Sequence, residues 1–304
     1  MKSIGVLLMS LGTPNHLDEM EAYLLDIRGG RPLTPEFVNE LKERYRKAGG
    51  RSPLLDITKA QAAKLEELLN KEKGNFKVYV GMRHWHPYIP TIMEQMAKDG
   101  VTEMISFPMT PFYSKLSFEA YHDKVRESQE KLKLPFEIVF AKSWHNHPLL
   151  IESHAELLKE SLAKLEATPK VLFTAHSLPE RILKDKDPYP DQLLESASLA
   201  AQKAGITDWE FAYQSQGGSR EPWLGPKVED KLDAYAAQAI RNVLIDPIGF
   251  VCDHMEILYD IDILFKGIAK EKGIRLTRTP SLNVHPTFIR AMAAVVLETV
   301  SVLR

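Results

Sequence analysis

The sequence predicts an α/β protein built from two similar doubly wound halves that face each other across a cleft. Short apolar segments of strand length alternate with longer amphipathic segments along the 304 residues. Continuous apolar strands separated by helices are typical of a parallel sheet covered on both faces. The strands fall into two sets of four, so we expect a mainly parallel, four-stranded, Rossmann-like sheet in each half. The predicted strands span residues 4–9, 76–81, 103–108 and 136–140, followed by 171–175, 209–213, 242–248 and 275–279.

Amphipathic segments fill the intervals between these strands and predict the helices. Each set of strands also opens with a strand that runs into a tight turn, at residues 12–14 and 176–179, which supports the similarity of the two halves. The predicted helices span residues 17–26, 34–47, 56–71, 88–98, 117–132, 147–163, 190–204, 227–237, 261–272 and 285–301.

We expect the two halves to meet near residue 114. Residues 1–114 form the first half, to which the C-terminal helix 285–304 returns, and residues 115–284 form the second, which holds the candidate metal-binding residues. Residues 11–60 are atypical, because about 65 residues separate the first two strands. An excursion of this length in an α/β domain typically forms a lid or wall over a ligand.

The composition is that of an ordinary globular protein and excludes several functional classes. Hydrophobic residues make up 44%, charged residues 26%, and the net charge is -2, so neither nucleic acid nor an anionic membrane surface is an expected partner. No apolar run reaches 18 residues, so no integral membrane segment is expected, and the run at 4–9 is too short for a signal peptide. The one cysteine, Cys252, cannot form a disulfide or hold an iron–sulfur cluster within one chain, and it favours a cytoplasmic location.

Two motifs carry the residues best suited to metal chemistry. His176 lies just past the apolar run 171–173, and residues just past the carboxyl end of a strand face the ligand crevice of an open parallel sheet. Asp253, Glu256 and Asp260 stand at positions i, i+3 and i+7, which share one face of a helix. One imidazole and a row of hard carboxylates suit a divalent transition metal that is received and passed on, not one that is held for structure.

Each candidate also has a structural alternative. His176 is equally consistent with a capping or core histidine, and Glu256 with Asp260 is consistent with a solvated helix face. Asp253 and His254 are better interpreted as residues that brace the site through hydrogen bonds. The remaining histidine pairs are interpreted as structural because neither has an evident third ligand: His84 with His86, and His145 with His147.

Short motifs from one end of the chain to the other form a pattern that is specific in its order and spacing. They lie at residues 11–14, 27–31, 52–54, 174–179, 187–192, 214–216, 222–226 and 250–256. Together they resemble the ferrochelatase family, whose members insert ferrous iron into a porphyrin in heme biosynthesis. The resemblance is greatest to the short Gram-positive enzymes that act on coproporphyrin III, which lack the membrane-binding lip and the cluster-binding extension of mitochondrial forms.

The resemblance implies roles for individual residues. His176 and Glu256 match the catalytic residues that bind iron, and Asp260 continues a path of carboxylates along a helix with a widened π turn. Arg83 and His84 match a basic pair near an outer metal site. The positions that match residues holding the porphyrin and its carboxylates are Leu11, Arg28, Arg44, Tyr45, Ser52 and Tyr121.

Three positions depart from the family pattern. Leu11 stands where the coproporphyrin-type enzymes carry a tyrosine as axial ligand to the product iron, so protoporphyrin IX stays open as a substrate. Leu264 stands where relatives have a third acidic residue one turn beyond Asp260, which shortens the path. His86 stands where an acidic residue is common.

Metal insertion sets chemical requirements that these residues can meet. The macrocycle must bend, two pyrrole N–H protons must reach a base, and the iron must lose its water ligands stepwise. His176, with an ordinary pKa of about 6.5, can accept a pyrrole proton or bind iron, but not both at once. Glu256 has the same two roles open to it, and a nearby cation favours the ligand role.

We therefore expect a ferrochelatase that inserts Fe²⁺ into coproporphyrin III, with protoporphyrin IX as the next substrate. Iron is expected as a substrate, and no resident cofactor is expected. We further expect a monomer that passes its product to a transient heme acceptor protein. Two alternatives stay open: a cobalt or nickel chelatase acting on a corrinoid or siroheme precursor, and a non-catalytic heme- or metal-binding protein.

Overall fold

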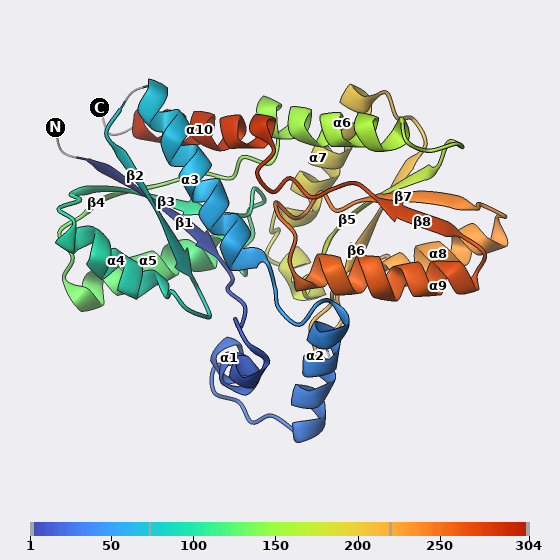
Figure 1. Cartoon of the computed structure of the whole chain (residues 1–304), viewed down its shortest axis with the longest axis horizontal. Coiled ribbons are helices and arrows are strands. Elements are labelled where there is room, and N and C mark those ends of the chain that lie inside the picture. Colours follow the sequence, from blue (N-terminus) through green and yellow to red (C-terminus); the bar gives the residue numbers. More distant parts are fainter. Residues whose placement is uncertain (1–2, 73, 219–220, 302–304) are drawn as a thin grey trace. The chain divides into compact units, whose positions relative to one another are not determined.

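Two four-stranded sheets, each with all its strands parallel, organise the chain. The computed structural model describes residues 3–72, 74–218 and 221–301 (Figure 1). The chain divides into two compact units: unit 1 comprises Met1–Trp144 and Asn283–Arg304, and unit 2 comprises His145–Leu282. The predicted α/β fold class with two four-stranded parallel sheets is confirmed.

The sheet of unit 1 has the strand order β2-β1-β3-β4. Its inner strand β1 is fully buried from Val6 to Met9, as expected for a parallel strand covered on both faces. Helices α4 and α5 pack on one face of the sheet, and α3 and α10 lie on the other (Figure 1). The strands are β1 (Ile4–Ser10), β2 (Phe76–Met82), β3 (Glu103–Pro108) and β4 (Glu137–Phe140), and the helices are α3 (Leu54–Glu72), α4 (Ile89–Lys98), α5 (Phe118–Leu132) and α10 (Pro286–Val300).

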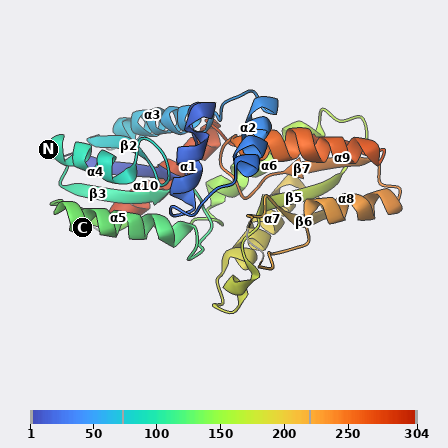
Figure 2. The same cartoon turned by 90° about the horizontal axis from the view of Figure 1, so that it is seen from below.

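The long excursion between β1 and β2 is helical. It contains the short helix η1 (Leu17–Glu19), α1 (Met20–Ile27) and α2 (Pro35–Lys47), followed by α3. Gly12 starts it with φ +91°, and a Cβ there would lie 2.9 Å from the backbone nitrogen of Trp85, so only glycine fits this turn. Helices α1 and α2 extend away from the sheet of their unit (Figures 1 and 2).

The sheet of unit 2 has the order β6-β5-β7-β8, which repeats the pattern of unit 1. Helix α8, the π-helix η3 and α9 pack on one face, where their apolar side chains form a single buried cluster with strand residues such as Leu172 and Val243. Helices α6 and α7 pack against each other on the other side (Figure 1). The elements are β5 (Lys170–His176), β6 (Trp209–Gln214), β7 (Asn242–Asp246), β8 (Arg275–Arg278), α6 (Pro148–Leu162), η2 (Glu180–Leu183), α7 (Tyr189–Ala204), α8 (Val228–Ala237), η3 (Glu256–Phe265) and α9 (Lys266–Glu271).

All eight predicted strands are present, with ends that differ by one or two residues at most. The division of the chain differs from the expected one, because the structure separates the units between Trp144 and His145 and not near residue 114. The physical reason is that β4 pairs with β3 in the first sheet, so α5 and β4 belong to unit 1. Among the described residues, no helix combines the length and apolar character needed to cross a membrane.

Candidate active site

His176 is the last residue of β5, at the carboxyl edge of the second sheet. The five residues before it are buried, whereas its own side chain keeps 31% of its surface exposed. Its Nδ1 contacts the carbonyl oxygen of Ser177, and because a carbonyl can only accept, Nδ1 carries a proton. The hydroxyl of Tyr189 donates to the carbonyl oxygen of His176 at 2.9 Å. The other ring nitrogen, Nε2, is therefore the atom available for proton transfer or metal binding.

Glu256 begins the π-helix η3 and faces His176. Its Oε1 lies 3.4 Å from Nε2 of His176, and its Oε2 lies 3.8 Å from Nε2 of His254. Its backbone is tied to the neighbouring strand, because Gln214 at the end of β6 donates from Nε2 to the carbonyl oxygen of Glu256 at 3.0 Å. The two residues predicted to carry catalysis are thus brought together from separate elements.

His176 and Glu256 each stabilise the charged form of the other. Burial favours neutral forms of both groups, but the carboxylate of Glu256 outweighs it and raises the pKa of His176 above its usual value. The imidazolium in turn lowers the pKa of Glu256 to about 2, again against the effect of burial. Burial lowers the pKa of His254, so that this second imidazole is neutral. At neutral pH the site therefore holds an ion pair, and a divalent metal that binds His176 must displace its proton.

Asp260 is held apart from this pair. It is buried, with 9% of its surface exposed, and Ser215 donates a hydrogen bond from its hydroxyl to Oδ2 of Asp260. Ser215 lies just beyond β6 with φ +58°, a left-handed conformation that is uncommon for a non-glycine residue and is often found at functional sites. The structure thus gives Asp260 a specific partner in place of a solvated helix face.

The helix that carries these carboxylates is a π-helix from Glu256 to Phe265, and the π turn implied by the resemblance is confirmed. Single π segments are rare and occur mostly at functional sites. The prediction that Asp253, Glu256 and Asp260 share one helix face is wrong, because Asp253 precedes the helix. Its carboxylate is bound by Ser281 at 2.7 Å and by Arg278 at 3.1 Å. The three carboxylates therefore have three different sets of partners.

The described residues contain no group of three or more histidine, cysteine, aspartate or glutamate side chains positioned to hold one metal ion. His176 and Glu256 form a pair, and Asp260 does not join them in a single coordination sphere. A pair of ligands with partly exposed side chains leaves coordination positions for water or substrate, unlike a closed structural site.

The predicted porphyrin-binding residues all lie in unit 1. Leu11 follows β1 and is 37% exposed. The guanidinium of Arg28 lies 5.4 Å from the ring centre of Phe37, and Arg44 forms an exposed ion pair with Glu40 at 2.6 Å. Such exposed ion pairs contribute little to stability, so Arg44 can exchange its partner for a ligand carboxylate at little cost.

The other three predicted porphyrin-binding residues are buried: Tyr45, Ser52 and Tyr121. Ser52 accepts a hydrogen bond from the backbone nitrogen of Leu54 at 3.3 Å, at the start of α3. The ring centre of Tyr121 lies 5.9 Å from the guanidinium of Arg83 and belongs to the core between α4, α5 and the sheet. These are contacts of buried core residues, and the role of the three side chains toward a porphyrin stays a prediction.

A polar cavity of about 450 Å³ lies within unit 1, beside the basic pair Arg83 and His84. Nδ1 of His84 lies 2.8 Å from Oδ1 of Asp26, and the hydroxyl of Tyr88 donates to Oδ2 of Asp26 at 3.2 Å. Burial lowers the pKa of His84. The outer metal site implied by the resemblance stays a prediction, and its histidine is engaged by a carboxylate in this structure.

The histidines interpreted as structural have structural contacts. His86 packs edge-on against Trp85 and Tyr88, with ring centres 5.4 Å and 4.6 Å away. His145 pairs with Glu195 at 2.9 Å. His147 caps α6 by accepting a hydrogen bond from the backbone nitrogen of Leu149 at 3.2 Å.

Three residues at the site had no predicted role: Tyr189, Gln214 and Ser215. Gln214 is the last residue of β6, the strand beside β5, and Ser215 follows it, so the rule that placed His176 at the carboxyl edge of the sheet applies to both. Tyr189 opens α7, and no local pattern connects it to the carbonyl of His176.

A protein-family model described as Ferrochelatase matches residues 3–300 of this chain. The chain is 44% identical over 297 residues to a protein of Herpetosiphon aurantiacus named Ferrochelatase, covering 96% of this chain and 97% of that protein. It is 41% identical over 300 residues to a protein of Halalkalibacterium halodurans named Coproporphyrin III ferrochelatase, covering 97% and 96%. A protein of Bacillus subtilis with the latter name is 38% identical over 304 residues, covering 98% of each chain.

Solved structures with a similar fold include SirB from Bacillus subtilis with Fe³⁺, at a TM-score of 0.63 and 12% identity, covering 98% of this chain and 95% of that one. CbiX, described as the terminal enzyme for biosynthesis of siroheme in denitrifying bacteria, gives a TM-score of 0.50 at 11% identity, covering 98% and 99%. Because these identities are low, the likeness shows the fold alone.

Proposed function

The chain belongs to the ferrochelatase family, and from this premise we propose that it inserts ferrous iron into coproporphyrin III. The observation that carries the proposal is the pair formed by His176 and Glu256, 3.4 Å apart at the carboxyl edge of the second sheet. The choice of porphyrin is supported by relatives named Coproporphyrin III ferrochelatase that are 38–41% identical over nearly their whole length.

The two residues of the pair have different roles in this proposal. Glu256, with a pKa of about 2, is a weak base and a good anionic ligand, so its carboxylate receives the iron. Once the dication neutralises that carboxylate, the imidazolium of His176 loses its support and releases its proton through its exposed edge. Neutral His176 then accepts a pyrrole proton at Nε2 as the iron enters the macrocycle, and the second pyrrole proton leaves to solvent.

Recognition of the porphyrin is assigned to residues of unit 1. Porphyrin propionates are carboxylates, and the planar fork of arginine binds a carboxylate through two parallel hydrogen bonds. Arg28 and Arg44 are the proposed partners, with Leu11, Tyr45, Ser52 and Tyr121 contacting the macrocycle. Asp260 is proposed to take iron on its way to Glu256.

The protein is further proposed to act as a cytoplasmic monomer that holds no resident cofactor and passes its iron–porphyrin product to a transient heme acceptor protein. The supporting observation on cofactors is Cys252, the one cysteine, which is buried. Burial raises the pKa of its thiol to about 12, so it does not form the thiolate that an iron–sulfur cluster requires.

The second candidate function is insertion into protoporphyrin IX, which Leu11 favours because it offers no hydroxyl at the end of β1. A cobalt or nickel chelatase of a corrinoid or siroheme precursor is not favoured, since the family match and the 38–44% identical relatives are ferrochelatases. The same findings disfavour a non-catalytic heme- or metal-binding protein.

The test is anaerobic insertion of Fe²⁺ by the purified protein, followed by absorbance, with coproporphyrin III and protoporphyrin IX side by side. We expect faster turnover with coproporphyrin III. Preference for protoporphyrin IX would select the second candidate, and absence of insertion with both would refute the proposed function.

A further inference from the structure

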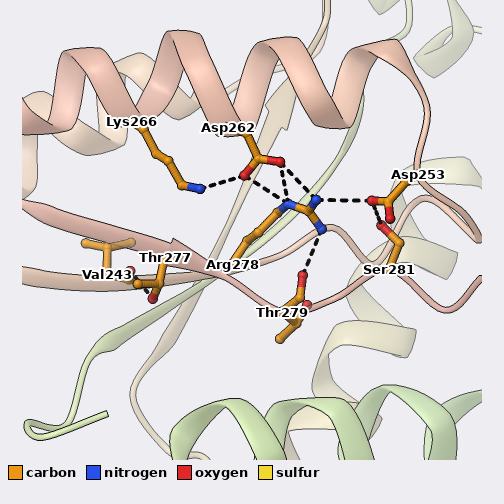
Figure 3. Close-up of polar contacts among 8 residues, drawn as sticks. All are labelled: Val243, Asp253, Asp262, Lys266, Thr277, Arg278, Thr279 and Ser281. Carbon is orange, nitrogen blue, oxygen red and sulfur yellow. Dashed lines mark hydrogen bonds and ion pairs between the residues drawn. The ribbon is translucent and has the colours of Figure 1, made fainter. Parts of the chain in front are cut away.

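Arg278, at the end of β8, is the centre of a charged network in unit 2 that the sequence did not predict (Figure 3). Its Nε donates to both carboxylate oxygens of Asp262 at 3.1 Å, and its Nη2 donates to Oδ2 of Asp262 at 2.9 Å. The same Nη2 lies 3.1 Å from Oδ1 of Asp253, and Nη1 donates to the carbonyl oxygen of Thr279 at 3.1 Å. All three guanidinium nitrogens are therefore used, and the side chain is only 14% exposed.

Each carboxylate has a second donor that fixes it in place. Lys266 donates to Oδ1 of Asp262 at 2.7 Å, and Ser281 donates to Oδ1 of Asp253 at 2.7 Å (Figure 3). Burial opposes the charges, but the bonds from Arg278 and Lys266 outweigh it and lower the pKa of Asp262. Asp262 and Arg278 therefore remain an ion pair across the neutral range, joined by charge-assisted hydrogen bonds.

The two carboxylates held by Arg278 bracket Glu256 in the sequence. Asp253 stands three positions before Glu256, and Asp262 stands six positions after it on the same π-helix. The backbone of Glu256 itself is held by Gln214 at 3.0 Å. Gln214 belongs to β6 and Arg278 to β8, the two edge strands of a sheet in which β5 ends in His176.

We propose that Arg278 is a positioning residue that sets the distance between Glu256 and His176 by clamping both sides of the segment that carries Glu256. This inference rests on the proposed function. Arg278 touches neither residue and acts through Asp253 and Asp262. The clamp needs the planar fork of arginine, because a lysine ammonium cannot bind Asp262 through two nitrogens and still reach Asp253.

The test compares Arg278→Gln with the matched control Arg275→Gln. Arg275 lies on the same strand, its side chain is exposed, and within the described part of the chain it forms a long ion pair with Glu166 at 3.9 Å. We expect R278Q to lower kcat for iron insertion roughly tenfold, as misplacement of a reacting group by a fraction of an ångström does, while the KM for coproporphyrin stays within about twofold. R275Q should match the wild type in both constants, and R278K should recover only part of the lost kcat.

Every outcome decides the inference. R278Q with wild-type kcat, or with a loss confined to the porphyrin KM, overturns it, as does full recovery in R278K. If R278Q lacks a cooperative unfolding transition, Asp253→Asn replaces it, with the same drop in kcat expected and wild-type kcat again overturning the inference. A wild-type protein that inserts no iron refutes the proposed function and this inference together, whereas an active wild type with an unaffected variant refutes this inference alone.

Discussion

The two units have sheets with equivalent strand orders, but the first strands of the two sheets, β1 and β5, end in very different side chains. β1 in unit 1 runs into Leu11 and Gly12, and the chain then leaves on the long helical excursion through α1 and α2. β5 in unit 2 runs into His176 and reaches α7 after only the short helix η2. The shared topology fixes where a site forms, at the carboxyl edge of the sheet, and the residue at the end of the inner strand decides what chemistry that site can do.

A histidine–carboxylate pair occurs in each unit, and the pKa of the histidine shifts in opposite directions. For His84, burial and the neighbouring cation Arg83 outweigh Asp26, and its pKa is lowered. For His176, Glu256 outweighs burial with a smaller contribution from Asp260, and its pKa is raised. The comparison shows that the balance between burial, the carboxylate partner and the surrounding charges, and not the presence of a partner alone, determines the direction of the pKa shift.

The largest expected effect comes from removing the imidazole of His176 at the end of β5. His176→Ala should lower kcat for iron insertion by about 10³-fold, because it removes the proposed base, while cooperative thermal unfolding is retained. The matched control is His147→Ala in the same unit, which removes a helix cap and should cost about 1 kcal/mol of stability with unchanged kcat. Turnover near the wild-type level in H176A would remove this residue from the mechanism.

Glu256→Gln should have the next largest effect and lower kcat by about 10²-fold. The same variant tests whether Glu256 raises the pKa of His176. In the wild type, activity requires neutral His176, so the rate rises with pH through a pKa above the usual histidine value. Without the carboxylate that raises it, this pKa falls and the rising limb of the pH–rate profile moves to lower pH. The measurement is the pH dependence of kcat/KM for the wild type and the variant. A rising limb that stays in place or moves to higher pH would contradict the inference that Glu256 raises the pKa of the catalytic His176.

Asp260→Ala should act on iron delivery and leave porphyrin binding unchanged. We expect the KM for Fe²⁺ to rise roughly tenfold, a size typical for loss of a residue next to the first metal ligands, with unaltered affinity for coproporphyrin. Ser215→Ala is the companion variant, because it removes the hydrogen bond to Asp260 and keeps the carboxylate. A selective loss of porphyrin affinity in D260A would refute this role.

Much of the fold and the central pair could be predicted from local sequence signals. Buried strands such as 171–175 are short apolar runs, and the position of His176 at the sheet edge follows from the rule for parallel strands. The spacing of the carboxylates indicates Glu256 as a candidate, and the resemblance adds its catalytic role and the π turn. The structure places Glu256 beside His176, at the start of the π-helix η3.

The remainder depends on contacts between residues far apart in the sequence. Asp253 was expected on the helix face of Glu256, and its actual place is set by Arg278, which lies 25 positions later on another strand. The expected boundary near residue 114 conflicts with the assignment of strand 136–140 to the first set of four, and the pairing of β4 with β3 shows that this assignment was right. Ser215 belongs to the motif at residues 214–216, but its left-handed backbone and its hydrogen bond to Asp260 appear only in the folded chain.

The smallest expected effect is that of substituting Leu11, which follows β1 in unit 1. Leu11→Tyr gives β1 a side chain with an oxygen that can bind ferric iron, so the affinity for iron coproporphyrin should rise about threefold, by roughly 0.6 kcal/mol. Leu11→Phe adds similar bulk without the hydroxyl and should leave that affinity unchanged. Both variants should keep kcat within about twofold, because the strand end that carries the proposed base is in the other unit. Fluorescence or absorbance titration with ferric iron coproporphyrin measures the difference, and equal affinities in the two variants would show that bulk, and not the oxygen ligand, governs binding at Leu11.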